Sequence, residues 1–209
     1  MNKGRFITLE GGEGVGKSTL AKALAHKIQT YGKNVVLTRE PGGSPGAEAI
    51  RSLVLTPPAG TEWSSLSQAM LFFAARADHL KTVILPSLQK GAWVICDRFT
   101  DSTRAYQAAG SGLENQTIDV LDQIAVGDSQ PDLTFILDLE YEVALQRRLQ
   151  RGEETDFFEK KSEQFHDRVR RAFLQIAADF PERCVVLDAS VDNEQLEDTA
   201  FKEIKARFL

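Results

Sequence analysis

The octet Gly11-Gly12-Glu13-Gly14-Val15-Gly16-Lys17-Ser18 has the spacing of a phosphate-binding loop, and it constrains the fold more than any other feature of the chain. Its glycines let backbone N–H groups turn toward a polyanion, its lysine reaches β- and γ-phosphate oxygens, and its serine suits a bound Mg²⁺. A strand-like run, residues 6–9, precedes the octet, and a helix-like pattern, residues 20–28, follows it. We therefore expect a nucleoside triphosphate at a helix N-terminus, where the helix dipole favours an anion.

Beyond the loop, short apolar runs alternate with longer helical patterns, as in β-α units. This predicts an α/β fold with three layers, α/β/α, around a five-stranded parallel sheet covered on both faces. The predicted strands are 5–9, 34–38, 92–96, 133–138 and 184–188, and the predicted helices are 17–30, 45–54, 65–89, 114–125, 140–150, 160–178 and 193–207. Residues 1–209 are expected to form one domain, with a lid segment at about 151–159.

Charge and composition limit the class of partner. The net charge of −5 over 209 residues disfavours general attraction to nucleic acids or membranes, so locally placed cations must hold any anionic ligand, which favours a small phosphorylated substrate. Cys96 and Cys184 lie far apart in apolar runs, as reduced thiols do, and the N-terminal residues lack the apolar core of a signal peptide. We therefore expect a cytoplasmic protein. His26, His79 and His166 lack metal-ligand spacing and are expected to be ordinary surface or packed side chains.

Charged residues follow four of the predicted strands, at the edge of a parallel sheet where ligands collect. They are Glu10 before the octet, the run Arg39-Glu40-Pro41-Gly42-Gly43, the run Asp97-Arg98-Phe99, and Asp138. Asp97 stands where a carboxylate can hold Mg²⁺ beside the loop serine; the alternative is a helix N-cap. Arg39 and Arg98 suit a phosphate dianion. Because Lys17 already serves the nucleotide, two further arginines imply a second, phosphorylated substrate and hence phosphoryl transfer.

Two further patterns concern how that substrate is held. The Glu40-Pro41 peptide belongs to a rigid turn, trans by default with cis as the alternative, which fixes the direction of Arg39. Phe72 and Arg76 lie one helical turn apart on one face, a spacing that suits stacking on a planar base and hydrogen bonding to its edge. The alternative is a core phenylalanine with a surface arginine.

These elements, together with Glu13 inside the loop and Ala105-Tyr106-Gln107, resemble thymidylate kinase of the bacterial type, a P-loop NTPase of the nucleoside monophosphate kinase superfamily, over essentially the whole chain. The loop marks only the superfamily, whereas the Arg39–Gly43 and Asp97–Phe99 runs in this order are specific. The resemblance implies transfer of the ATP γ-phosphoryl group to dTMP, giving dTDP for dTTP biosynthesis, with Mg²⁺. It also implies a homodimer, formed through the helices after residue 65 and around 114–125.

The resemblance further implies a role for each site residue. ATP is expected on Gly11, Gly12, Glu13, Gly14, Val15, Gly16, Lys17, Ser18 and Thr19, and Mg²⁺ on Ser18 and Asp97. The dTMP phosphate is expected on Arg39 and Arg98, with Arg51 as a further candidate. The nucleoside is expected on Phe72 (stacking), Arg76 and Thr103 (base edge), Glu13 (3′-hydroxyl), and Tyr106 and Gln107 (sugar). Lys17 and Arg98 are then catalytic, because phosphoryl transfer depends mainly on positioning and charge neutralisation.

The chain departs from the family at one cation. Some members carry an arginine in the loop where this chain has Gly14, and bacterial types commonly supply it from the lid as aspartate-arginine-hydrophobic-glutamate. Here the lid reads Asp156-Phe157-Phe158-Glu159. The γ-phosphate clamp is therefore expected from Arg147, Arg148 or Arg151, of which we favour Arg151, and the alternative is that these arginines only cover a solvated helix.

Other classes fit less well. A dinucleotide fingerprint needs a third glycine where Lys17 stands, and a GTP switch needs asparagine-lysine-x-aspartate and aspartate-x-x-glycine elements that the chain lacks. An ATP-binding interaction module would leave Arg39 and Arg98 idle. Another nucleotide kinase would share the framework, and Phe72, Arg76 and Glu13 are the discriminating residues. Because a thymine methyl is worth only about 1 to 3 kcal/mol, we expect leaky use of dUMP but firm exclusion of purines.

Overall fold

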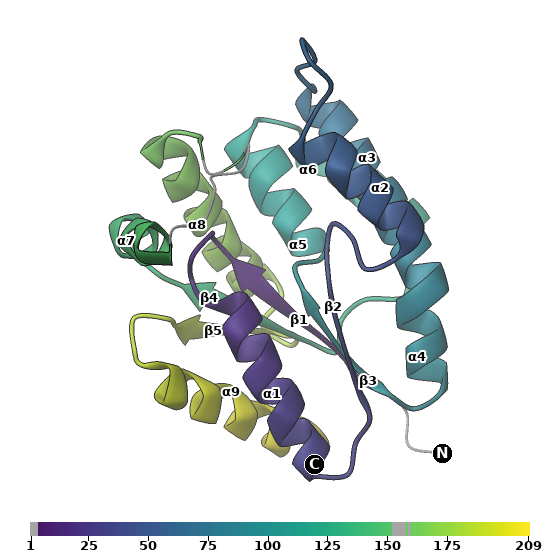
Figure 1. Ribbon diagram of the computed structural model, residues 1–209, viewed down its shortest axis with the longest axis vertical. Helices are drawn as coiled ribbons and strands as arrows, with labels where there is room; N and C mark the ends of the chain where they lie inside the picture. Colours follow the sequence, from purple (N-terminus) through teal and green to yellow (C-terminus); the bar gives the residue numbers. More distant parts are fainter. Residues whose placement is uncertain (1–3, 152–157, 159) are drawn as a thin grey trace.

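A parallel sheet with strand order β2-β3-β1-β4-β5 organises the computed structural model, which describes residues 4–151, 158 and 160–209 (Figure 1). The strands are β1 (Phe6–Gly11), β2 (Val35–Arg39), β3 (Trp93–Asp97), β4 (Leu133–Asp138) and β5 (Cys184–Asp188). In the register, Leu9 lies opposite both Asp97 and Phe135, and Arg39 lies opposite Asp97. The carboxyl ends of the strands therefore meet at one edge, and the residues that follow them are brought together there.

Helices cover both faces of the sheet, which confirms the three-layer α/β/α arrangement (Figure 1). They are α1 (Lys17–Thr30), α2 (Pro45–Leu55), α3 (Ser65–His79), η1 (Leu80–Ile84), α4 (Leu85–Gln89), α5 (Thr100–Thr103), η2 (Arg104–Gly110), α6 (Asn115–Ala125), α7 (Tyr141–Arg151), α8 (Glu163–Asp179) and α9 (Asn193–Phe208). Helices α1 and α9 lie side by side and share one apolar core with the sheet. Helices α3, η2, α6 and α8 pack on the opposite face of the sheet.

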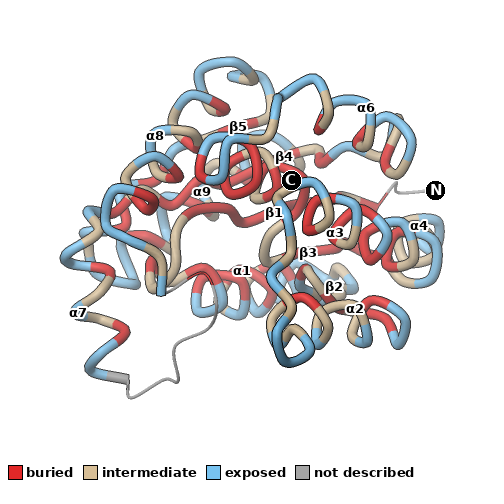
Figure 2. Tube along the Cα trace, turned by 90° about the horizontal axis from the view of Figure 1, so that it is seen from above, coloured by how far each residue is buried: buried red, intermediate tan, exposed pale blue. Residues whose placement is uncertain are grey.

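Alternation along β1 explains the two cores. Ile7 and Leu9 point into the core under α1 and α9, whereas Phe6 points into the core under α3 and η2. Figure 2 shows buried residues concentrated along the central strands and on the inner sides of the helices. Glu10 is fully buried at the end of this strand. A carboxyl in that position requires polar partners, and these come from the site described below.

All five predicted strands are confirmed, three of them with bounds shifted by one or two residues. The single helix predicted over 65–89 consists of three consecutive helical segments: α3, the π-helical segment η1 (Leu80–Ile84), and α4. Pro86 in the first turn of α4 lacks an N–H to bond backward, which fits a wider turn just ahead of it. The helical stretch α5 and η2, residues 100–110, was not predicted. Ala105 and Tyr106 of this stretch pack on aromatic residues of α8. The local sequence does not indicate this contact, because α8 lies far along the chain.

The segment predicted as a lid, about 151–159, lies outside the described residues except for the backbone end of α7 and Phe158. Within the described part of the chain, none of the helices combines the length and apolar character that a membrane span needs.

Candidate active site

The glycine-rich octet joins β1 to α1, as predicted. Gly14 and Gly16 adopt left-handed backbone with φ of 75° and 100°, and Gly16 is the N-cap of α1. Lys17 folds back over the loop and donates to the carbonyls of Gly11 at 3.1 Å and Gly12 at 2.5 Å. Burial, with Arg98 nearby, lowers the pKa of Lys17 to about 8. An anion placed in this loop would favour the charged form of the lysine.

Ser18 and Asp97 come together although 79 positions separate them in sequence. Ser18 Oγ donates to Asp97 Oδ2 at 2.5 Å. Asp97 does not cap the following helix, because the N-cap of α5 is Phe99. A hydroxyl and a carboxylate oxygen side by side form the kind of hard oxygen pair that Mg²⁺ prefers, so the donor set fits this ion.

Arg98 has left-handed backbone, with φ of 70°, which is strained for a residue with a side chain. Buried Glu10 holds the turn, since its carboxylate accepts from the Phe99 N–H at 2.7 Å and from Ser102 Oγ at 2.6 Å. The guanidinium then donates to Ser102 Oγ at 3.0 Å and to Glu13 Oε1 at 3.1 Å. Glu10 was noted in the sequence without a role, and the structure makes it the anchor of the Arg98 turn.

The pKa values of the two buried carboxyl groups are shifted in opposite directions. Burial and the neighbouring Asp101 raise the pKa of Glu10 to about 8. Burial alone would also raise the pKa of Glu13, but Arg98 and Lys17 outweigh it and lower that pKa. Tyr106 donates to Glu13 Oε1 at 2.6 Å, so Glu13 is a negative centre between cations and a phenol.

Two cavities open along this edge and meet. One, of about 510 Å³, lies around the loop and is lined by Lys17, Ser18, Thr19 and Asp97. The other, of about 120 Å³, is lined by Phe72, Arg76, Thr103, Tyr106 and Gln107. Glu13, Arg51 and Arg98 line both cavities. A phosphate in the smaller cavity would therefore share two arginines with a phosphate at the loop.

Arg76 lines the smaller cavity, and two of its three guanidinium nitrogens have hydrogen-bond partners among the described residues. Nε donates to Glu40 Oε2 at 2.7 Å and Nη2 donates to Thr103 Oγ1 at 3.1 Å. The buried Nη1 has no hydrogen-bond partner among the described residues. A buried donor of this kind is costly while it stays unbonded, and an acceptor group such as a base carbonyl that reached it from the cavity would supply the missing bond.

Aromatic rings form the apolar part of the same cavity. Phe72 is buried and lies 6.2 Å from Phe158, with the ring planes tilted by 38°. Phe158 also meets Tyr106 edge-on at 5.5 Å. Gln107 faces the cavity as well, while its amide nitrogen donates to Gln68 at 3.3 Å. Phe158 was known from the sequence only as part of the atypical lid pattern, and its ring supplies a second flat surface beside Phe72.

Of the two arginines expected beside Arg98, Arg51 lines the smaller cavity and Arg39 does not. The Arg39 side chain is 54% exposed, and its guanidinium donates to both oxygens of Glu48 at 3.0 and 3.1 Å. Arg39 is not among the residues that line the smaller cavity. Arg51 lines both cavities and donates to the Pro41 carbonyl at 2.7 Å, beyond a Glu40–Pro41 peptide that is cis. The structure thus pairs Arg98 with Arg51 rather than with Arg39.

The three arginines considered for the γ-phosphate clamp have different surroundings. Arg147 donates to the Ala189 carbonyl at 2.9 Å, away from the loop. Arg148 is buried against the loop: a Cβ atom at Gly14 would lie 2.8 Å from its Cγ. Arg151 ends α7, and its side chain lies outside the described residues.

Comparison with known proteins gives a consistent result. The family model for thymidylate kinase matches residues 9–200. The chain is 47% identical to a thymidylate kinase of Rhodopseudomonas palustris over 99% of this chain and 91% of the relative, and 50% identical to one of Caulobacter vibrioides over 92% and 91%. It is also similar to the crystal structure of thymidylate kinase from Ehrlichia chaffeensis, with a TM-score of 0.77, 36% identity, and coverage of 97% of this chain and 99% of that one.

Proposed function

The chain belongs to the thymidylate kinase family, and we propose that its two joined cavities divide the substrates of that reaction, ATP at the loop and dTMP in the smaller cavity. The enzyme phosphorylates dTMP to dTDP with ATP, a step of dTTP biosynthesis. The observation that carries the division is the shared lining: Arg51 and Arg98 face both cavities, so the accepting phosphate would lie beside the one transferred.

At the donor end, Lys17 and the amides of the loop would hold the ATP phosphates. Mg²⁺ on Ser18 and Asp97 would neutralise charge on the phosphate oxygens. Arg98, fixed in advance by Glu13 and Ser102, would stabilise the charge that develops between the two substrates without having to reorganise. Arg148 and Arg151 are the proposed γ-phosphate clamp, with Arg148 already against the loop.

At the acceptor end, Phe72 would stack on thymine, Arg76 Nη1 and Thr103 would bond its edge, and Glu13 would contact the 3′-hydroxyl. Tyr106 and Gln107 would close around the sugar. Arg39 could reach the phosphate only by releasing Glu48, so Arg51 is the better proposed partner of Arg98.

A panel of nucleoside monophosphates with ATP and Mg²⁺ tests this assignment. We expect dTMP to have the highest kcat/KM, dUMP to be about 10- to 200-fold worse through the missing methyl group, and dGMP to be far worse. Comparable turnover of dGMP and dTMP would contradict the proposed cavity.

We also propose a homodimer. The neighbouring helices α3 and α6 expose apolar side chains, namely Leu66, Met70, Val120 and Ile124, and Ile124 is 78% exposed. A second copy covering this face would remove that area from water. We propose, in addition, that residues 1–209 form a single kinase domain with a lid at about 151–159. We also propose a cytoplasmic location, which the two unpaired, buried cysteines support.

A further inference from the structure

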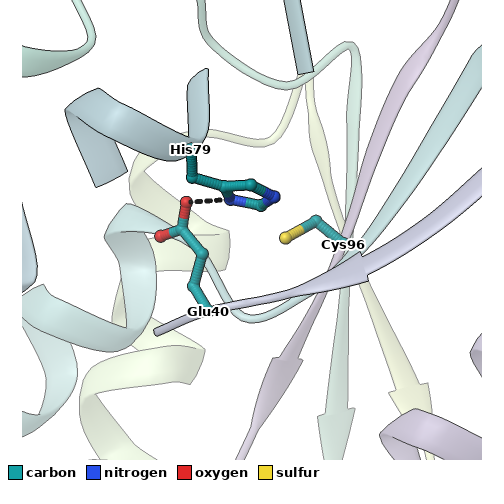
Figure 3. Close-up of side chains that lie close together, drawn as sticks. All are labelled: Glu40, His79 and Cys96. Carbon is teal, nitrogen blue, oxygen red and sulfur yellow. Dashed lines mark hydrogen bonds and ion pairs between the residues drawn. The ribbon is translucent and has the colours of Figure 1, made fainter. Parts of the chain in front are cut away.

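Three buried side chains from separate elements meet behind the dTMP cavity (Figure 3). Glu40 follows β2, His79 ends α3 and Cys96 lies in β3, and their candidate ligand atoms are within 4.8 Å of one another. Glu40 lines the cavity, whereas His79 is fully buried and does not.

The hydrogen bonds of this cluster form a chain with a defined direction. Glu40 lies against the Arg76 guanidinium, and its carboxylate can only accept. His79 Nδ1 therefore donates to Glu40 Oε1 at 3.0 Å, and the other ring nitrogen, Nε2, is hydrogen-bonded to the Thr38 hydroxyl at 2.7 Å. Glu40 Oε2 accepts from Arg76 Nε at 2.7 Å. The chain thus runs from Thr38 in β2 through His79 and Glu40 to Arg76.

A metal site would need the same atoms in a different state. The Cys96 thiol donates to the Arg98 carbonyl at 3.1 Å, and burial raises the pKa of Cys96 well above its ordinary value, against the thiolate that a metal requires. Both nitrogens of His79 already have partners. The observations favour a hydrogen-bonded support over an ion.

We propose that His79 is a positioning residue for base recognition, which holds Glu40 so that Arg76 directs its Nη1 donor into the dTMP cavity. This inference rests on the proposed role of Arg76. The guanidinium lies over the rings of Phe73 and Phe99, at 4.7 and 5.1 Å, and these rings restrict its plane. The bond to Glu40 then sets its direction within that plane.

The backbone leaves His79 little freedom. A Cβ atom at Gly43, where φ is 86°, would lie 2.3 Å from His79 Nε2, so the turn after Pro41 closes directly over the ring. Small changes at His79 must therefore pass to Glu40 or to this turn, because both contact the imidazole.

Two substitutions separate the two ends of the imidazole. Asparagine places its amide nitrogen where Nδ1 lies and can still donate to Glu40, whereas glutamine reaches the Nε2 position and keeps only the Thr38 contact. We expect His79→Gln to raise the KM for dTMP about tenfold and to narrow the preference for dTMP over dCMP, whose base presents an amine in place of a carbonyl. The KM for ATP and kcat should stay within about twofold. His79→Asn should recover most of the KM for dTMP, and exposed His26→Gln is the matched control.

The double variant with Arg76→Ala tests whether His79 acts through the arginine. We expect His79→Gln to add no further loss to Arg76→Ala. If Arg76→Ala leaves the KM for dTMP and the base preference unchanged, the proposed role of Arg76 fails. If Arg76→Ala impairs the KM for dTMP and the base preference but His79→Gln changes neither of them, the positioning role alone fails. The positioning role also fails if His79→Gln lowers kcat and raises the KM values for ATP and dTMP alike.

Thermal unfolding identifies variants that do not fold. Should His79→Gln be one of them, Thr38→Val removes the far end of the chain and should raise the KM for dTMP in the same direction by a smaller factor, about threefold; no change would overturn the inference. One tightly bound transition metal ion per chain in the purified enzyme, measured by mass spectrometry, would also overturn it.

Discussion

Arg98 donates to Glu13 Oε1 at 3.1 Å, which ties the residue after β3 to the centre of the phosphate loop. Both side chains line both cavities, so in the proposed division of substrates this ion pair lies between the donor and the acceptor. The pair is largely buried, with side-chain exposures of 18% and 12%, and it is supported by Ser102 and Tyr106. The Arg98 guanidinium is therefore held in one place by its protein partners, as electrostatic stabilisation of phosphoryl transfer requires.

Arg98→Lys keeps the charge but loses the fork that bonds two acceptors at once. We expect kcat to fall by two to three decades, about 3 kcal/mol, with little change in the KM for ATP. Steady-state kinetics measures this. The control is Arg171→Lys on α8, a position whose side chain is 76% exposed, and this change should leave kcat unaltered. An Arg98→Lys enzyme with normal kcat would refute the proposed role.

Asp97→Asn removes a negative ligand from the oxygen pair with Ser18. The concentration of Mg²⁺ that gives half-maximal rate should rise about tenfold or more, because the ion loses an anionic partner. A titration of activity with Mg²⁺ at saturating ATP measures it. Asp188→Asn, an exposed aspartate at the end of β5, is the matched control, and equal Mg²⁺ dependence of the two variants would count against the site.

Lys17 should make ATP binding dependent on pH. Its pKa of about 8 in the empty loop means that the charged form, which binds phosphate, is lost as pH rises above that value. The Kd of a non-hydrolysable ATP analogue should be constant below pH of about 8. Above that pH the Kd should increase, with a slope that approaches tenfold per pH unit. Calorimetry in buffers of different ionisation enthalpy should detect proton uptake on binding in that range. A constant Kd up to pH of about 9.5 would show that this lysine stays charged.

Glu10 should make stability fall with rising pH. Its pKa is raised from 4.5 to about 8, so the folded protein keeps a proton that the unfolded chain has already lost between these values. Folding is then favoured most at the lower end of this window, and the contribution is lost as pH rises toward 8. Glu10→Gln keeps an oxygen for the Phe99 N–H without titrating. Urea unfolding from pH of about 5 to 8 should show a shallower decline for the variant than for the parent, and parallel curves would contradict the assigned shift.

Ile124→Asp places a charge at the centre of the proposed dimer face. We expect it to halve the mass measured by light scattering at micromolar concentration, because a buried unpaired carboxylate opposes association. Leu149→Asp on α7, where the leucine is 69% exposed, controls for the loss of an exposed apolar side chain. A monomeric parent, or equal masses for parent and Ile124→Asp, would refute this face as the interface.

The sheet could be predicted because strands covered on both faces have a simple sequence pattern, namely short apolar runs with charged residues at their ends. The same logic placed Ser18 beside Asp97, since Asp97 ends β3 and Ser18 belongs to the loop-helix junction after the neighbouring parallel strand β1. The direction of the Arg39 side chain could not be predicted, because a strand end gives the location of a residue but not its rotamer, and Glu48 in α2 bonds the guanidinium.

Long-range polar chains could not be predicted. Glu40 and His79 are 39 positions apart, and His79 looks like an ordinary packed imidazole in the sequence. Glu10 reaches Phe99 and Ser102 about ninety positions away, across a turn whose left-handed Arg98 no local pattern indicates. The π-helical η2 likewise depends on aromatic residues of α8, which lie far along the chain.

The close packing of Arg148 on Gly14 bears on how enzymes of this kind can exchange one cation for another. A side chain at position 14 would meet the Ala144 carbonyl at 2.6 Å as well as the Arg148 stem at 2.8 Å. Shortening Arg148 alone therefore leaves a backbone clash, and α7 itself would have to shift. A side chain at position 14 and the present packing of α7 exclude each other, so moving the cation from this helix into the loop requires a change in both elements.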